Sequence, residues 1–291
     1  MNVAEDPGCA SLHPGYACFM RTARPIAHLE LDPAKIRRAV HTAVVVSTEV
    51  VNFHFRSMDG ANLSEPAEPP NTPLFGFRGG NLTAEQRRLL IENWVLAKAF
   101  QDLLRAVRHA LEIAHVFTSL LGRTHTVKSD TLIAEFLRPF EARAAGLRFP
   151  QLLDEVNERL ATKLQFSSSY KSLQAVRNCL EHRSGIVGLP ETRGKQHFEF
   201  SIPRMKVFYV RSDAEVEIEK GEVIEPGDDR TEVKLYMRIE ERKRSLDLGE
   251  RIKFTLREFN EVAFACHFLG DQLASKMPNP NRDLSDKDSV S

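Results

Sequence analysis

The chain has 291 residues, which is enough for one large domain or two small ones at about 100–200 residues each. Its 40 Lys and Arg residues balance 40 Asp and Glu residues, so the composition excludes a polybasic protein while allowing a local basic patch. No apolar run reaches the ~20 residues that span a bilayer, and residues 1–25 lack the charge and apolar core of a signal peptide. We therefore expect a cytoplasmic protein that makes no membrane contact.

The cysteines and histidines follow no pattern of a metal site or a disulfide framework. Cys9, Cys18, Cys179 and Cys266 form no CxxC pair, and the ten histidines form no HExxH set. The sequence also contains no phosphate-binding GxxxxGKS/T or GxGxxG loop and no GxSxG hydrolase motif. We therefore expect no metal and no cofactor.

The first 82 residues are predicted to form an arm, one helix and a loop. Residues 1–32 are expected to be a poorly ordered arm. Residues 33–82 begin with a helix, because Asp32 and Pro33 have the order of an N-cap and a first helical residue. This helix is expected to end near Phe55. A loop rich in Pro and Gly then follows up to residue 82.

Residues 83–190 are predicted to form a helical bundle. Thr83 and Gln86 have the spacing of a capping box, and an apolar period runs from there to Leu121 without a proline. We interpret the apolar residues of this long helix, Trp94 among them, as core. Three shorter helices are predicted over residues 129–145, 150–164 and 168–183, and the last of them ends before Gly185.

Residues 191–254 change to an alternating pattern and are predicted to form an antiparallel β segment. Strands are expected over residues 197–203, 206–210, 214–219 and 232–240, and the charge run 240–244 is interpreted as a solvated strand end. A closing helix over 255–277 and a disordered tail over 278–291 follow. The expected fold is mainly α: a helical bundle with a small antiparallel β segment inserted before the last helix.

Polar residues gather near the end of the helix predicted over 168–183. Arg177, Asn178 and His182 lie outside its apolar stripe, and Asn178 and His182 share a face. RNA cleavage needs a base for the 2′-OH, an acid for the leaving 5′ oxygen and a cation for the phosphorane charge. Histidine can transfer protons near neutral pH, and the arginine fork binds phosphate oxygens. These residue types suit catalysis by Arg177 and His182, with Asn178 as an orienting residue.

The same spacing also has a purely structural interpretation. On an ideal helix Arg177 and His182 lie roughly 140° apart, so a two-fold axis or a loosened helix end is needed to bring them to one target. Arg177 and Glu181, four residues apart, have the spacing of a surface ion pair. His182 lies at a helix C-terminus, where its positive charge is favoured. On spacing alone, a structural scaffold and a catalytic site both remain open.

The segment Arg177-Asn178-Cys-Leu-Glu181-His182 resembles the Arg-x4–6-His signature of the HEPN superfamily (higher eukaryotes and prokaryotes nucleotide-binding). The resemblance covers six residues closely and the bundle of 83–276 more loosely. It implies a HEPN-type bundle and a metal-independent endoribonuclease whose site forms across a homodimer. Such an enzyme leaves 2′,3′-cyclic phosphate and 5′-OH ends, and it is often a toxin, a phage-defence effector or an RNA-processing factor.

By position, the resemblance makes Arg177 and His182 catalytic and Asn178 a supporting residue. This chain departs from the superfamily pattern at Glu181, whose acid competes with RNA phosphate for Arg177, and in having the β segment. It also has no tyrosine two residues after His182. This argues against the subgroup that is silenced by nucleotidyl transfer onto that tyrosine.

Four further basic residues are expected to contact RNA: Arg183, Arg242, Lys243 and Arg244. The expected partners are an RNA substrate, a second copy of the chain and an antitoxin or regulatory protein. The alternative function is a non-catalytic module of HEPN type that binds RNA, a nucleotide or a partner protein.

Overall fold

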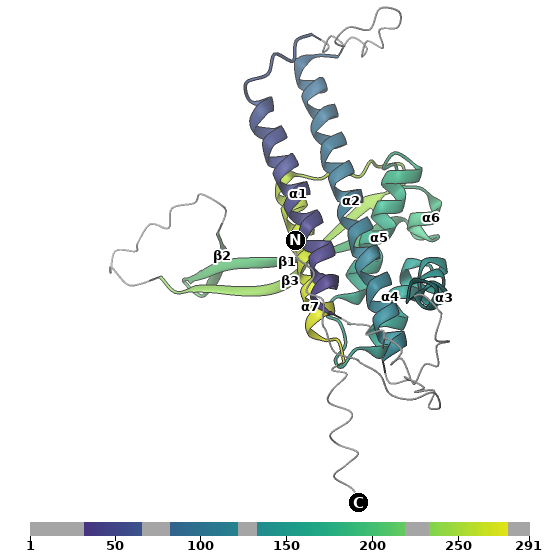
Figure 1. Ribbon diagram of the computed structural model, residues 1–291. Coiled ribbons are helices and arrows are strands. Elements are labelled where there is room, and N and C mark those ends of the chain that lie inside the picture. Colours follow the sequence, from purple (N-terminus) through teal and green to yellow (C-terminus); the bar gives the residue numbers. More distant parts are fainter. Residues whose placement is uncertain (1–31, 66–81, 122–132, 219–232, 279–291) are drawn as a thin grey trace, which may run out of the picture.

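The computed structural model describes residues 32–65, 82–121, 133–218 and 233–278. The predicted N-terminal arm and C-terminal tail lie outside the described residues, apart from Asp32 and Pro278. Within the four ranges, the elements labelled in Figure 1 are α1 (Ala34–Met58), α2 (Ala84–Leu120), α3 (Ile133–Gly146), α4 (Phe149–Arg159), α5 (Ser167–His182), α6 (Leu189–Thr192), β1 (His197–Arg211), β2 (Ala214–Glu217), β3 (Leu235–Asp247) and α7 (Leu256–Ser275).

The fold is mainly helical, and a three-stranded antiparallel sheet precedes the last helix, which confirms the predicted fold class. In the sheet, β1 lies between β2 and β3. The strands predicted over 197–203 and 206–210 form the single strand β1, which continues through Pro203. Among the described residues, β2 pairs with residues 208–211 of β1 and no strand pairs with that edge of β1 at Pro203, so a residue without an N–H is tolerated there.

Capping boxes begin two of the helices that were expected from the sequence. The Thr83 hydroxyl accepts a hydrogen bond from the Gln86 N–H (3.2 Å), and the Gln86 side chain accepts one from the Thr83 N–H (3.0 Å). Thr255 and Glu258 exchange the same two bonds at the start of α7. Each box satisfies N–H groups that have no partner inside the helix. The positions at which α2 and α7 begin were therefore predictable.

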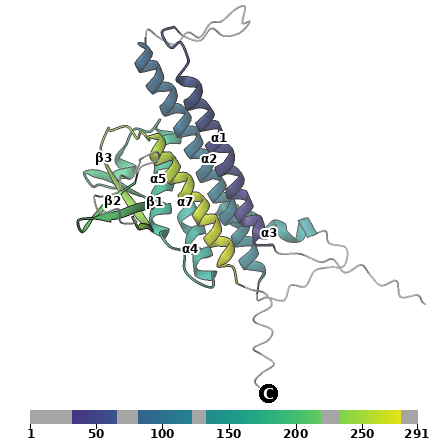
Figure 2. The ribbon, with the colours of Figure 1, turned by 90° about the vertical axis from the view of Figure 1, so that its left-hand side faces the viewer.

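α1 and α2 form a pair of helices, one end of which extends beyond the rest of the fold (Figures 1 and 2). Nearer the N-terminus of α1, both helices pack against α7. Val40 lies so close to Gly270 of α7 that a Cβ there would be 3.2 Å from the Val40 Cβ. Further along this pair of helices, Trp94 of α2 is 62% exposed and Phe53 of α1 is 68% exposed. The interpretation of Trp94 as a core residue is therefore wrong, because α2 extends past the elements that could cover it.

α5 lies in the middle of the fold, where it packs against α2, α4 and β1. Leu173 and Val176 are completely buried, as the apolar stripe predicts. The Tyr170 hydroxyl donates a hydrogen bond to the Ala265 carbonyl of α7 (2.9 Å), and burial raises the pKa of this phenol well above its ordinary value. These contacts fix the helix on which the candidate catalytic residues lie.

An ion-pair cluster joins the sheet to α7. Arg204 of β1 is 7% exposed, and its guanidinium donates hydrogen bonds to Glu217 and Glu240 (2.6 Å each) and to Glu261 (3.5 Å). Burial lowers the pKa of Arg204, but the hydrogen bonds to Glu217 and Glu240 outweigh that effect, so the net shift is upward. The charges that β1 buries against α7 are therefore paired.

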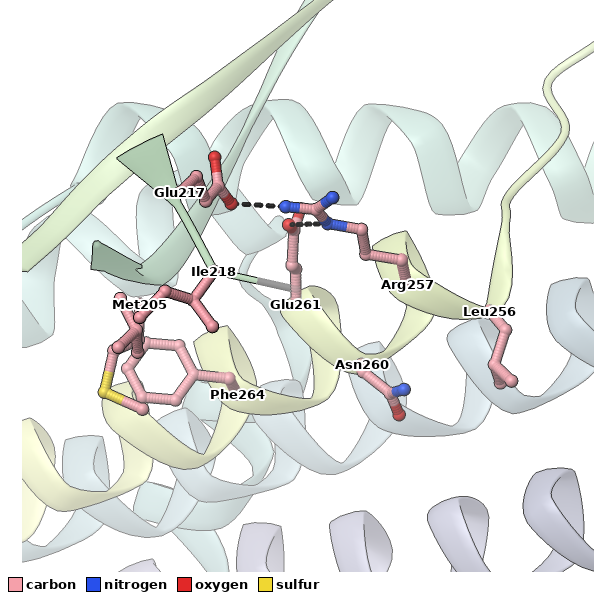
Figure 3. A pocket seen from close by; sticks show the side chains of 9 residues that line it. Met205, Glu217, Ile218, Leu256, Arg257, Asn260, Glu261 and Phe264 are labelled. Atoms are coloured by element: carbon pink, nitrogen blue, oxygen red, sulfur yellow. Dashed lines mark hydrogen bonds and ion pairs between the residues drawn. The ribbon is translucent and has the colours of Figure 1, made fainter. Parts of the chain in front are cut away.

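A cavity of about 490 Å³ lies beside this cluster, between the sheet and α7. Figure 3 shows Arg257 between Glu217 and Glu261, with which it forms ion pairs, while Met205 and Phe264 lie together on the apolar side. The cavity therefore has mostly apolar walls and a charged edge whose acids and bases are paired with each other.

Candidate functional site

The candidate residues lie on the last two turns of α5, and the backbone explains why the helix ends there. The N–H groups of Arg183 and Gly185 both donate to the Cys179 carbonyl (3.0 Å each). Gly185 has φ = +78°, a left-handed conformation that glycine adopts without strain. α5 therefore ends at His182, one residue before the predicted end at Arg183, and the chain turns away directly after it.

Arg177 and His182 both approach one carboxylate oxygen. Arg177 Nη1 lies 2.6 Å from Glu181 Oε2, and His182 Nε2 lies 3.7 Å from the same oxygen. The ion pair between Arg177 and Glu181, which the structural interpretation of the spacing predicts, is therefore present. Both side chains approach this oxygen from one helix, although an ideal helix places them far apart around the axis, and only Arg177 is within hydrogen-bond distance of it.

The two basic side chains differ in exposure. The His182 side chain is 63% exposed, whereas the Arg177 side chain is 21% exposed. An exposed imidazole beside a half-buried guanidinium suits proton transfer next to an anion.

Asn178 is held by its neighbours on α5. Its Oδ1 accepts hydrogen bonds from Gln174 Nε2 (2.9 Å) and from Arg177 Nη1 (3.4 Å). Among the described residues it makes no hydrogen bond to His182. Asn178 is therefore placed to orient Arg177 rather than the imidazole.

A groove of about 580 Å³ lies beside the candidate residues, between α5 and the segment that joins α6 to β1. Asn178 and Arg183 are part of its lining. This volume is within the range of about 300–1,000 Å³ that is typical of ligand-binding clefts. The remaining lining residues are mostly polar: Pro150, Ser168, Lys171, Ser172, Ala175, Pro190, Glu191, Thr192, Arg193, Lys195, His197, Phe198 and Glu199.

Arg183, predicted to contact RNA, is engaged in a structural interaction. Its guanidinium donates to Glu191, whose side chain is almost completely buried, and Glu191 also accepts a hydrogen bond from the Gly188 N–H (2.9 Å). The pair fastens α6 to the end of α5. Burial raises the pKa of the nearby Cys179 thiol, an effect that Arg183 partly opposes.

The three basic residues predicted to contact RNA from the sheet lie on two different faces. Arg242 forms a two-bond pair with Glu261 of α7 (2.7 and 2.8 Å), and Arg244 donates to Glu258 (2.9 Å). Lys243 is exposed and lies two residues after Glu241, whose side chain accepts a hydrogen bond from the Ser169 hydroxyl of α5. Since residues two apart on a strand point to the same face, Lys243 lies on the α5 side of the sheet, away from α7.

Two basic residues of the groove, Arg193 and Lys195, were not among the residues predicted from the sequence. They lie in the turn between α6 and β1, and both are exposed. The sequence contains a local indication of a basic turn, because Arg193-Gly194-Lys195 has two basic residues around a glycine shortly before a predicted strand.

No protein-family model matches the chain, and no curated protein or solved structure matches it either. None of the helices in the described ranges has the length and apolar composition needed to cross a membrane. Among the same residues, His, Cys, Asp and Glu side chains do not gather in groups of three or more that could hold a metal ion. The argument for function therefore rests on the geometry at the end of α5.

Proposed function

We propose that the protein is a metal-independent endoribonuclease of HEPN type that acts in the cytoplasm as a homodimer, as a toxin or phage-defence effector. The observation that carries this proposal is the shared oxygen: Arg177 and His182 both lie near Glu181 Oε2. A phosphate oxygen of RNA has the same negative charge as the carboxylate. An RNA phosphate that replaced Glu181 at this place would be in reach of both side chains.

The chemistry follows from the groups present. His182 takes the 2′-OH proton or gives one to the leaving 5′ oxygen, and Arg177 stabilises the negative charge of the phosphorane. Asn178 keeps the guanidinium in place through its Oδ1. Attack of the 2′ oxygen on the adjacent phosphorus expels the 5′ oxygen, so the products are a 2′,3′-cyclic phosphate and a 5′-OH.

The reaction needs one proton acceptor and one proton donor at the same time. A single α5 supplies one histidine at this place. A homodimer that faces two copies of α5 toward each other supplies a second His182, so that one imidazole acts as base and the other as acid.

The test is incubation of total RNA with the purified protein in EDTA, alongside Arg177→Ala and His182→Ala. His109→Ala is the control for His182 in residue type and exposure, because the His109 side chain on α2 is 64% exposed. Arg105→Ala is the control for Arg177 in residue type and in pairing with an acid of its own helix, Asp102. We expect cleavage by the wild type and both controls, and loss of cleavage in the two α5 variants. Intact RNA in every lane, with the wild type folded, would overturn the proposal.

The second candidate function is a non-catalytic RNA-binding module, and the ion pair between Arg177 and Glu181 favours it. A carboxylate that already neutralises Arg177 reduces the charge available to the phosphorane. Under this alternative the wild type retains RNA during purification but leaves it intact in the same assay.

A further inference from the structure

We propose that the groove between α5 and the α6–β1 turn binds single-stranded RNA, with Arg193 and Lys195 contacting its phosphates and the strand directed toward His182. The proposal rests on the proposed function for the choice of RNA. It adds Arg193 and Lys195, which belong neither to the HEPN-like motif nor to the basic residues predicted from the sequence.

The groove follows one face of α5 toward the candidate catalytic histidine. Lys171, Ala175 and Asn178 line the groove. With His182, these residues are spaced i, i+4, i+7 and i+11, so all four lie on one face of the helix. From Ser168, another lining residue, to Asn178 the face is about 15 Å long, and His182 lies about 6 Å further on. At about 3.4 Å per stacked nucleotide, roughly four nucleotides fit along the groove before the chain reaches the imidazole.

The charges in the groove distinguish Arg193 and Lys195 from the other basic residues of its lining. Lys171 pairs with Asp154 (2.6 Å), Arg183 pairs with Glu191, and His197 pairs with Asp247. Within the described part of the chain, Arg193 and Lys195 have no acidic partner and are exposed. They therefore keep a full positive charge at the groove of a protein whose net charge is zero.

The backbone of the turn is arranged around Arg193. This residue has φ = +50° where α6 ends, and its N–H donates to the Leu189 carbonyl (3.0 Å). Gly194 follows with φ = +80°. Glycine or asparagine usually occupies a left-handed position at the end of a helix. This conformation makes Arg193→Gly compatible with the backbone of the turn.

On the opposite face of the sheet, two of the basic residues predicted to contact RNA are already engaged. Arg242 and Arg244 are bonded to Glu261 and Glu258 of α7, so their charges are already neutralised. A strand of RNA therefore meets unpaired positive charge in the groove beside α5. His182 lies at the end of the same face of α5 that lines this groove.

The test compares binding of a fluorescein-labelled 12-nucleotide RNA of mixed sequence, followed by fluorescence anisotropy. All proteins are the full chain with His182→Ala, so that the RNA is not cut. The groove variant adds Arg193→Gly and Lys195→Ala; glycine suits the left-handed conformation at residue 193 and preserves the turn. The control variant instead adds Arg38→Ala and Lys234→Ala, which remove the same two charges from exposed positions outside the groove.

We expect the groove variant to bind the RNA at least tenfold more weakly than its parent, and the control variant to differ by less than twofold. Two lost phosphate contacts should also flatten the plot of log affinity against log salt concentration by about 1.4. Equal weakening in both variants, or no binding by the parent protein, would overturn the proposal. Specific weakening of the groove variant, combined with intact RNA in the EDTA assay, would support the groove and reject the nuclease.

Discussion

Glu181 Oε2 forms an ion pair with Arg177 at 2.6 Å and lies 3.7 Å from Nε2 of His182. One carboxylate therefore occupies the place where both candidate catalytic side chains meet. It acts as a competitor for the anion that the proposed reaction needs. Removing its charge should separate the structural role of the ion pair from the catalytic role of Arg177.

We predict that Glu181→Gln increases the rate of RNA cleavage about twofold. An exposed i, i+4 ion pair contributes about 0.3–0.5 kcal/mol, and that amount of competition corresponds to a factor of about two in rate. The expected loss of stability is of the same size. Single-turnover cleavage and urea unfolding measure the two effects. A fall in cleavage rate would show instead that Glu181 takes part in proton transfer.

The pair between Arg183 and Glu191 should be structural. We predict that Glu191→Ala lowers the free energy of unfolding by about 2 kcal/mol, because it leaves a partly buried guanidinium and the Gly188 N–H without their acceptor. Glu199→Ala, an exposed residue of the same groove, is the control and should change stability by less than 0.5 kcal/mol. Chemical denaturation followed by circular dichroism gives both values. Equal effects would contradict the assignment.

Arg204 should be the most sensitive charged residue of the sheet. Arg204→Met leaves Glu217, Glu240 and Glu261 close together without the cation between them, and we predict a loss of about 3 kcal/mol. Arg238 also pairs with Glu240 but is 45% exposed, so Arg238→Met should cost less than about 1 kcal/mol. Thermal and urea unfolding of the two variants measure this difference. A larger loss of stability in Arg238→Met than in Arg204→Met would contradict the claim that burial makes the Arg204 ion pairs more important.

Glu155 should make the stability of the fold depend on pH. The hydrogen bond from His115 (3.1 Å), together with the bond and the charge of Arg143, holds the pKa of Glu155 below its ordinary value of 4.5. A carboxyl group whose pKa is lower in the folded than in the unfolded state stabilises the fold above the unfolded pKa. This stabilisation is lost as the pH falls through the folded pKa.

We therefore predict that Glu155→Gln is less stable than the wild type at pH 7 and that the difference shrinks as the pH falls below about 4.5. Glu158→Gln on the same helix is exposed and should follow the wild type at every pH. Urea unfolding between pH 3.5 and pH 7 measures all three proteins. A pH-independent difference for Glu155→Gln would contradict the pKa assignment.

The sequence predicted the helices well because their signals are local. The capping boxes of Thr83 and Thr255 and the stripe of Leu173 and Val176 involve residues that are close along the chain. The exposure of Trp94 could not be predicted from local sequence signals, because it depends on how far other elements extend along α2. The continuous strand β1 depends likewise on which partner pairs at Pro203.

The candidate site was partly predictable. The ion pair of Arg177 and Glu181 follows from i, i+4 spacing, and the end of α5 follows from Gly185. The pairing of Arg183 with Glu191 and of Arg242 with Glu261 joins separate elements, so residue type alone could not show that these charges are engaged. For the same reason, Arg193 and Lys195 were identified only once the groove beside α5 was known.

The central claim is tested most directly by the ratio of RNA cleavage rates of the wild type and His182→Ala in EDTA, with His109→Ala as the matched histidine control. General acid–base catalysis contributes about 10²–10⁴-fold. We predict that His182→Ala is at least 100-fold slower than the wild type, that His109→Ala is unchanged, and that the wild-type products end in 2′,3′-cyclic phosphate. A His182→Ala variant that cleaves RNA at the wild-type rate would contradict the account.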